Sequence, residues 1–243
     1  MTDNNKGEPE INRVMGIFAH PDDPEFFSGA TFARWATEGK EVIFVVATSG
    51  DKGSDDPEMT HDRLVRMREI EERNAAAALG VKEVIFLRYP DGELRPTLEL
   101  RRELTRLIRL KKPDAVVTCD PTVYWYGTRY INHPDHRAIG ASVLEAVFPT
   151  ARDRLNFIEL ERDEGLQTHK VRYVYISGNQ DPTTTVDITD HIETKIAALR
   201  EHKSQIKDME AMAKNIRERS LDPRAPTDAP RYVESFRVIT LPG

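Results

Sequence analysis

Short apolar runs rich in β-branched residues alternate along the chain with segments of helical periodicity. This alternation predicts an α/β fold, a Rossmann-like three-layer sandwich in which helices cover both faces of a mostly parallel central sheet. The sequence contains no internal repeat, low-complexity segment or interior linker. We therefore expect one domain over residues 13–243, preceded by a mobile polar tail over residues 1–12.

The predicted strands are short, mostly apolar stretches that stop at a polar loop, as buried parallel strands do. They cover residues 13–19, 41–47, 83–87, 114–118 and 170–176, with an edge strand at 232–239. The predicted helices have apolar residues at helical spacing and, in two cases, a glycine directly after the last turn. They cover residues 28–38, 60–79, 98–110, 137–147 and 188–207. Long polar loops are expected at 48–59 and 120–135.

The composition excludes several classes of protein. Hydrophobic residues make up 39% of the 243 residues and charged residues 31%, a balance typical of globular proteins. The longest apolar runs have about six residues, whereas a membrane span needs roughly 20, so we expect no membrane segment. The net charge is −6 and the basic residues are scattered, which argues against nucleic acid as the main partner.

Cysteine usage and the first residues bear on the cellular compartment. The single cysteine, Cys119, rules out an internal disulfide and a multi-cysteine zinc site, and it is typical of a reducing environment. The first ten residues are polar and lack the apolar core of a signal peptide. We therefore expect a cytoplasmic protein. The oligomeric state stays open, with a homo-oligomer among the alternatives.

Two histidine-containing motifs carry the strongest chemical signal. AHPDDPE at 19–25 follows the first predicted strand, and NHPDH at 132–136 ends the loop after the fourth. Either motif alone is typical of a helix cap or a solvated loop. Together they predict a shared metal site, because a doubly wound sheet brings its strand-end loops side by side. His20, Asp23 and His136 then form a three-ligand site with an open position for water, the catalytic form of a zinc site.

Three more residues of these motifs are left free for catalysis. Asp22, beside the ligands, is expected to take a proton from the attacking water as general base; alternatively it holds the loop by a hydrogen bond. His133 is expected to stabilise a developing oxyanion as a protonated imidazole, unless it is merely packed. Asp135 either orients His133, as the carboxylate of a triad does, or caps the following helix.

The motifs AHPDDPE at 19–25 and HPDHRAIG at 133–140 resemble those of the LmbE-like, or PIG-L, family of zinc-dependent N-acetylglucosaminyl deacetylases. Weaker similarities are Arg68-x-x-Glu71 before AAAALG at 75–80, YPDG at 89–92, and Lys195-x-x-Ala198 before His202-x-Ser204-Gln205. The resemblance implies the following roles: zinc ligands His20, Asp23 and His136, general base Asp22, oxyanion or leaving-group partner His133, and its supporting carboxylate Asp135.

The residues that would choose the substrate are less well marked. The resemblance implies that Arg68 contacts the substrate. Aromatic residues in the loop after the fourth predicted strand, among them Trp125 and Tyr130, either stack on a sugar ring or pack the loop against the core. We assign Trp125 and Tyr130 to substrate binding. The loops at 48–59 and 120–132 are candidate lids over the site, and the first is equally well a solvated loop.

We therefore expect a zinc-dependent hydrolase that removes an acetyl group from the amide nitrogen of an N-acetylglucosamine-containing small molecule. Three mixed nitrogen and oxygen ligands suit Zn²⁺, and Fe²⁺, Co²⁺ or Ni²⁺ fit the same set. The alternatives are an amidase of an amino-sugar thiol conjugate and a metal-binding scaffold without turnover. A nicotinamide-dependent dehydrogenase is disfavoured because His-Pro-Asp-Asp, not a Gly-x-Gly-x-x-Gly loop, follows the first strand.

Overall fold

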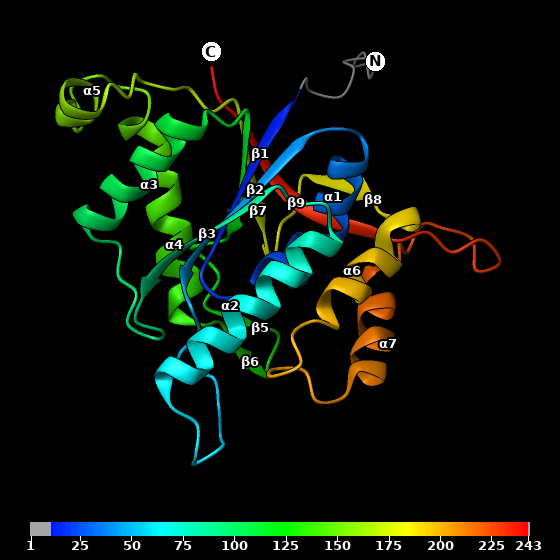
Figure 1. Cartoon of the computed structure of the whole chain (residues 1–243). Coiled ribbons are helices and arrows are strands. Elements are labelled where there is room, and N and C mark those ends of the chain that lie inside the picture. Colours follow the sequence, from blue (N-terminus) through cyan, green and yellow to red (C-terminus); the bar gives the residue numbers. More distant parts are fainter. Residues whose placement is uncertain (1–10, 243) are drawn as a thin grey trace, which may run out of the picture.

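The computed structural model, which describes residues 11–242, has one seven-stranded sheet with helices on both faces (Figure 1). The strands that form it are β1 (Arg13–Phe18), β2 (Glu41–Thr48), β3 (Glu83–Tyr89), β4 (Ala115–Cys119), β7 (Tyr173–Ser177), β8 (Thr184–Asp187) and β9 (Val233–Thr240). Their order is β3-β2-β1-β4-β7-β9-β8. Neighbours from β3 to β7 are parallel, and β9 is antiparallel to both β7 and β8. The expected α/β fold with a mostly parallel sheet is confirmed, and residues 1–10 of the predicted tail lie outside the described residues.

The helices divide between the two faces of the sheet. They are α1 (Asp23–Thr37), α2 (His61–Ala78), α3 (Leu98–Lys111), α4 (Pro134–Glu145), α5 (Ile158–Glu164), α6 (Ile192–Leu199) and α7 (Met209–Ser220), with the short η1 (Ala146–Thr150) and η2 (Thr189–His191). Helices α1, α2 and α6 pack together on one face, and α3 and α4 cover the other (Figure 1). Within residues 11–242, no helix is long and apolar enough to cross a membrane.

The strand order fixes where a ligand site can form. From β1 the chain moves outward through β2 to β3, and it later returns to place β4 on the opposite side of β1. The carboxyl ends of β1 and β4 therefore border a topological switch point, where open α/β sheets bind their ligands. Strands β1, β2 and β4 are almost entirely buried and apolar because helices cover both of their faces. Polar residues such as His20, Ser49 and Asp120 follow shortly after these strands end.

Helix α1 contains a break, which explains why the helical periodicity of the sequence is clear only from residue 28 onward. The helix begins at Asp23, before the predicted start at residue 28, and Ser28 has non-helical dihedral angles (φ −149°, ψ 16°). After the break, the main-chain N–H groups of Ala30 and Thr31 donate to the Glu234 carboxylate at 3.3 and 2.8 Å. The Lys195 ammonium lies 2.7 Å from the same carboxylate. A buried ion pair thus binds the main-chain groups that the helix break leaves free.

The C-terminal part of the fold departs most from the predicted elements. The helix predicted over 188–207 is wrong in its second half, because α6 ends at Leu199 and α7 follows as a separate helix. The intervening turn packs Ser204 against α2, and the N–H and hydroxyl of Ser204 donate to the Glu71 carboxylate on that helix at 2.8 and 2.6 Å. The strand predicted at 232–239 is not at the edge of the sheet, because β8 pairs with its outer side. The polar, exposed sequence of β8 concealed that strand.

Three further elements differ from the predicted ones. One helix starts earlier than predicted, and a hairpin and another helix form where no element was predicted. Helix α4 begins at Pro134 instead of residue 137, because His133 caps it and proline fits the first turn. The predicted loop at 120–135 contains a short hairpin of β5 (Trp125–Tyr126) and β6 (Tyr130–Ile131). Helix α5, which has seven residues, is too short to show a clear helical period.

Arg109 on α3 is the largest of the fully buried side chains. Its guanidinium donates to main-chain carbonyl oxygens of the segment that follows α4, at 2.8 to 3.2 Å: those of Thr150, Ala151, Asp153 and Asn156. One side chain therefore supplies donors to several main-chain carbonyls along an irregular segment, where few regular main-chain hydrogen bonds form.

We expect Arg109→Met to lower the free energy of unfolding by about 3 kcal/mol, because several main-chain acceptors lose a hydrogen bond from one buried guanidinium at once. Urea denaturation followed by circular dichroism measures the change. The matched control is Arg106→Met on the same helix, whose side chain is 40% exposed and pairs with Glu164. An exposed pair of this kind is worth about 1 kcal/mol or less. Equal losses in the two variants would contradict the organising role of Arg109.

Candidate metal centre and active site

The polar groups of the site come from loops at the carboxyl ends of three parallel strands. His20, Asp22 and Asp23 follow β1, Asp91 follows β3, and the segment 132–136 closes the loop after β4. Helix α4 can approach the end of β4 closely because residue 140 is glycine; a side chain there would collide with the main-chain carbonyl of Cys119. The two motifs singled out from the sequence therefore meet at one place in the fold.

The three predicted metal ligands lie together and are almost completely buried. His20, Asp23 and His136 are 7%, 5% and 7% exposed, and their ligand atoms all lie within 4.8 Å of one another. The Asp23 carboxylate is at the centre. Its Oδ2 is 3.3 Å from Nδ1 of His20 and its Oδ1 is 3.0 Å from Nε2 of His136. One nitrogen of each ring thus faces the same carboxylate.

The other nitrogen of each ring is held by an acceptor. Nε2 of His20 lies 3.0 Å from Asp91 and 3.3 Å from Asp135, and Nδ1 of His136 lies 3.0 Å from the amide oxygen of Asn132. Metal-binding histidines are oriented in this way, because an acceptor on the far nitrogen leaves the near nitrogen free of its proton. The donor set of two imidazoles and a carboxylate therefore fits a divalent metal ion.

The charges in the site support the same conclusion. Burial alone would raise the pKa of Asp23, but the imidazoles of His136 and His20 outweigh it and hold the pKa well below its usual range. Burial would lower the pKa of His20, but Asp23, Asp135 and Asp91 raise it well above the usual value. Three carboxylates thus converge on one buried imidazole, and such an excess of negative charge favours a cation.

Comparison with known proteins identifies the family. Residues 15–147, more than half of the chain, match the family model described as PIG-L, GlcNAc-PI de-N-acetylase. The chain belongs to the PIG-L family. The resemblance inferred from the two motifs is confirmed, and the matched region contains all three candidate ligands.

Relatives in the PIG-L family are deacetylases of acetylated amino sugars. The chain is 34% identical over 196 residues to diacetylchitobiose deacetylase of Thermococcus kodakarensis, covering 81% of this chain and 71% of the relative. It is 30% identical over 235 residues to 1D-myo-inositol 2-acetamido-2-deoxy-alpha-D-glucopyranoside deacetylase of Actinosynnema mirum, covering 80% and 81%. The structure of N,N'-diacetylchitobiose deacetylase from Pyrococcus horikoshii, complexed with its inhibitor MPG, superposes with a TM-score of 0.85 and 32% identity, covering 95% and 85% of the two chains.

Asp22, the predicted general base of this PIG-L protein, is held by Arg68. The Arg68 guanidinium donates to the Asp22 carboxylate at 3.3 Å, to the Pro21 carbonyl at 2.6 Å and to the Gly50 carbonyl at 3.1 Å. Burial raises the pKa of Asp22, and the nearby guanidinium opposes that rise. Gly50 must be glycine, because its φ is +63° and a side chain would collide with the guanidinium. Arg68, only 4% exposed, therefore ties the loops after β1 and β2 together.

His133 lies beside the candidate metal centre and is more exposed than the candidate ligands. Its ring is 4.5 Å from the ring of His20 in an edge-on arrangement, and 37% of its side chain is exposed. Its Nδ1 accepts the main-chain N–H of Asp135 at 3.2 Å, which places the proton of the neutral ring on Nε2. Burial and the neighbouring charge of His20 lower the pKa of His133. The structure thus favours a neutral ring that donates from Nε2, and not the protonated imidazole expected from the sequence.

Asp135 is fully buried and faces His20 more closely than His133. It lies 4.0 Å from Nδ1 of His133, too far for a hydrogen bond, and 3.3 Å from Nε2 of His20. Its oxygens also accept the main-chain N–H groups of Gly92 and Leu94 at 2.7 and 3.2 Å. Asp135 therefore orients the candidate metal ligand His20 and fixes the loop after β3.

The predicted substrate residues Trp125 and Tyr130 lie on opposite faces of the β5–β6 hairpin. Tyr126 pairs with Tyr130 and Trp125 with Ile131, and adjacent residues of a strand point to opposite faces. Burial raises the pKa of Tyr130, and the negative charge of Asp23 raises it further. Tyr130 thus lies within reach of the charges of the candidate metal centre, and Trp125 is on the opposite face of the hairpin.

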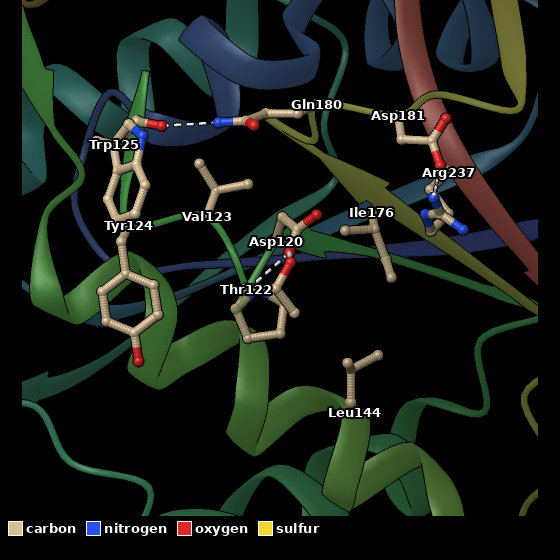
Figure 2. Close-up of a pocket in the computed structure, with 11 residues that line it drawn as sticks. Asp120, Thr122, Val123, Tyr124, Trp125, Leu144, Ile176, Gln180, Asp181 and Arg237 are labelled. Carbon is tan, nitrogen blue, oxygen red and sulfur yellow. Dashed lines mark hydrogen bonds and ion pairs between the residues drawn. The ribbon is translucent and has the colours of Figure 1, made fainter. Parts of the chain in front are cut away.

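On its outer side, Trp125 borders a cavity of about 380 Å³. Figure 2 shows this cavity between the 120–125 loop and β7, with Asp120, Val123 and Ile176 among its lining residues and Gln180 bonded to the Trp125 carbonyl. None of the three ligands is among its lining residues.

Two residues of the site were not assigned from the sequence. Asp91 belongs to the YPDG turn noted above, and a carboxylate directly after a strand was the signal that could have found it. Asn132 begins the second motif, but nothing local shows that its side chain binds His136. Asp91 accepts from the far nitrogen of the candidate ligand His20, from a distant part of the chain. Asn132 faces the far nitrogen of the candidate ligand His136, from one helical turn earlier.

Proposed function

We propose that the protein is a metal-dependent hydrolase that removes the acetyl group from the amide nitrogen of an N-acetylglucosamine-containing small molecule. The observation that carries the proposal is the cluster of His20, Asp23 and His136, with near nitrogens facing Asp23 and far nitrogens held by acceptors. Asp22 lies next to this cluster. Relatives in the PIG-L family carry names of amino-sugar deacetylases, which indicates the same class of substrate.

A divalent ion held by His20, Asp23 and His136 would polarise the amide carbonyl and acidify the attacking water. Zn²⁺ is the ion that we propose, because two imidazoles, one carboxylate and an open position form its catalytic ligand set. Fe²⁺, Co²⁺ and Ni²⁺ accept the same donors.

The residues of this chain handle the proton and the developing charge. Asp22 takes a proton from water as its oxygen bonds to the carbonyl carbon, and the Nε2–H of His133 donates a hydrogen bond to the oxyanion. The carbon–nitrogen bond then breaks, and Asp22 returns the proton to the departing amine. Acetate and a free amino sugar are the products. Arg68 keeps the Asp22 carboxylate in place during both transfers.

The test is release of acetate and free amine by purified protein, with metal removed by a chelator and then restored. The panel includes N-acetylglucosamine, N,N'-diacetylchitobiose, an N-acetylglucosamine–inositol conjugate and a thiol conjugate of an amino sugar. We expect equal amounts of acetate and amine from the acetylated sugars, and none without metal. Amine release only from the thiol conjugate would favour an amidase, and bound metal without any release would favour a scaffold.

Substrate contacts should differ between the two faces of the hairpin. We expect Tyr130→Ala to raise KM several-fold on every acetylated sugar with little change in kcat, because ring stacking contributes about 1 kcal/mol. Trp125→Ala should raise KM only for substrates that extend beyond one sugar ring. Steady-state kinetics on the monosaccharide and on diacetylchitobiose measure both effects. If Trp125→Ala raised KM on the monosaccharide as much as Tyr130→Ala, the hairpin faces would be wrongly assigned.

The proposal also covers the type of fold, the number of domains, the cellular compartment and the partner molecule. We infer a Rossmann-like sandwich from the order β3-β2-β1-β4-β7 with helices on both faces, and one domain over residues 13–243. The single cysteine is typical of a reducing compartment, which favours the cytoplasm. The partner that we propose is a small amino-sugar molecule.

A further inference from the structure

Asp22 has a backbone conformation that its surroundings must impose. Its φ is +95° and its ψ −28°, in the left-handed region that costs a residue with a side chain about 1–3 kcal/mol. Asp22 occupies the position before α1, yet its side chain makes no capping hydrogen bond there. The helix that follows therefore does not account for the conformation.

Helix α2 holds Asp22 at two points. The Glu72 carboxylate accepts the main-chain N–H of Asp22 at 3.0 Å. One turn earlier on the same face of the helix, Arg68 binds the Asp22 carboxylate at 3.3 Å and the Pro21 carbonyl at 2.6 Å. The backbone and the side chain of Asp22 are thus held by separate residues of one rigid element.

Glu72 is itself enclosed by polar groups in the interior. Its Oε2 lies 3.9 Å from Nε2 of His202, which lies 3.3 Å from the Glu25 carboxylate, and all three side chains are completely buried. His202 belongs to the turn after α6, so it joins a third element to this cluster. Buried ionisable groups of this kind usually stabilise a fold less than apolar residues of the same size would. Their presence behind the active-site loop therefore indicates a role in fixing its geometry.

We propose that Glu72 is a positioning residue, which keeps Asp22 in its left-handed conformation and so keeps the Asp22 carboxylate beside the metal centre. The inference rests on the proposed deacetylase function, in which Asp22 is the general base. Without the Glu72 acceptor, the loop relaxes and the base moves. A displacement of about 1 Å costs on the order of 10²-fold in rate, whereas the ligands His20, Asp23 and His136 keep their own contacts.

The decisive variants are Glu72→Met and Glu72→Gln. Methionine keeps the volume but removes the acceptor, so kcat should fall by about 10-fold or more while KM and metal content change less than about two-fold. Glutamine keeps an amide oxygen for the Asp22 N–H and should restore most of kcat. If Glu72→Met kept the wild-type kcat, or if Glu72→Gln were as impaired as Glu72→Met, the proposal would be overturned.

The matched control is Glu71→Met. Glu71 also joins α2 to the turn after α6, through Ser204, but it does not touch the Asp22 loop. This variant should lower the melting temperature without lowering kcat; equal losses of kcat in both variants would make Glu72 merely structural. Crystal structures give a measure independent of activity, since Asp22 should leave the left-handed region in Glu72→Met. An unchanged φ would overturn the inference, whereas a wild-type protein inactive on every substrate would overturn only the proposed function.

Discussion

Asp22→Asn should lower kcat by about 10²-fold or more, because an amide cannot take the proton that a general base removes from water. Asparagine tolerates the left-handed conformation and has nearly the shape of aspartate, so the loop keeps its geometry. Metal content should therefore stay at the wild-type level. Steady-state kinetics on an acetylated amino sugar, together with metal analysis of the same preparation, measure the two quantities.

Asp23→Asn is the neighbouring comparison for this prediction. Asp23 lies between His20 and His136 with one oxygen toward each ring, so its loss should remove metal and activity together. If Asp22→Asn lost metal as completely as Asp23→Asn, Asp22 would be a ligand and the proposed proton transfer would need another base. If Asp22→Asn kept full activity, the general base would lie elsewhere in the site.

His136→Ala should abolish metal binding at stoichiometric concentration and, with it, activity. Loss of an outer hydrogen-bond partner of a ligand already costs about 10–100-fold in metal affinity, and loss of the ligand itself should cost more. Only His20 and Asp23 would remain of the three donors. Metal analysis after dialysis, and titration of the metal-free protein with Zn²⁺, measure the change.

Two further variants provide comparisons for the loss of metal binding in His136→Ala. Asn132→Ala removes the acceptor 3.0 Å from Nδ1 of His136, so its metal affinity should fall between those of the wild type and His136→Ala. His61→Ala removes a histidine that is 68% exposed on the surface, and it should leave metal binding unchanged. Equal metal content in His136→Ala and His61→Ala would contradict the assigned metal centre.

The arrangement of the sheet was predictable because buried strands are marked by local patterns, namely short apolar runs that end at polar loops. Apolar runs such as 41–47 become fully covered strands, and the polar loops after them meet at one edge of the sheet. The predicted elements are wrong where long-range contacts override the local pattern. Residues 200–207 have helical character in sequence, but Ser204 turns toward Glu71 on α2 and the helix ends before it. Likewise, β8 forms because β9 offers a partner, not because its own sequence is apolar.

The same division applies to the active site. Sequence spacing alone predicted the cluster of His20, Asp23 and His136, since both motifs follow strands whose ends must lie together. It did not predict that Asp135 binds His20 instead of His133, because a few ångströms of loop position decide between them. Trp125 and Tyr130 looked equivalent as aromatic loop residues, and only the hairpin register places them on opposite faces.

The sequence by itself therefore determined the chemical groups, their order along the chain and the class of fold, because these depend on residue type and local periodicity. Only the tertiary structure decided which partner holds each group. Asp91 reaches His20 from the loop after β3, and Glu72 reaches the Asp22 N–H from a helix 50 residues away in sequence. Such contacts depend on how helices and loops pack over a shared sheet, and no spacing within one motif specifies that packing.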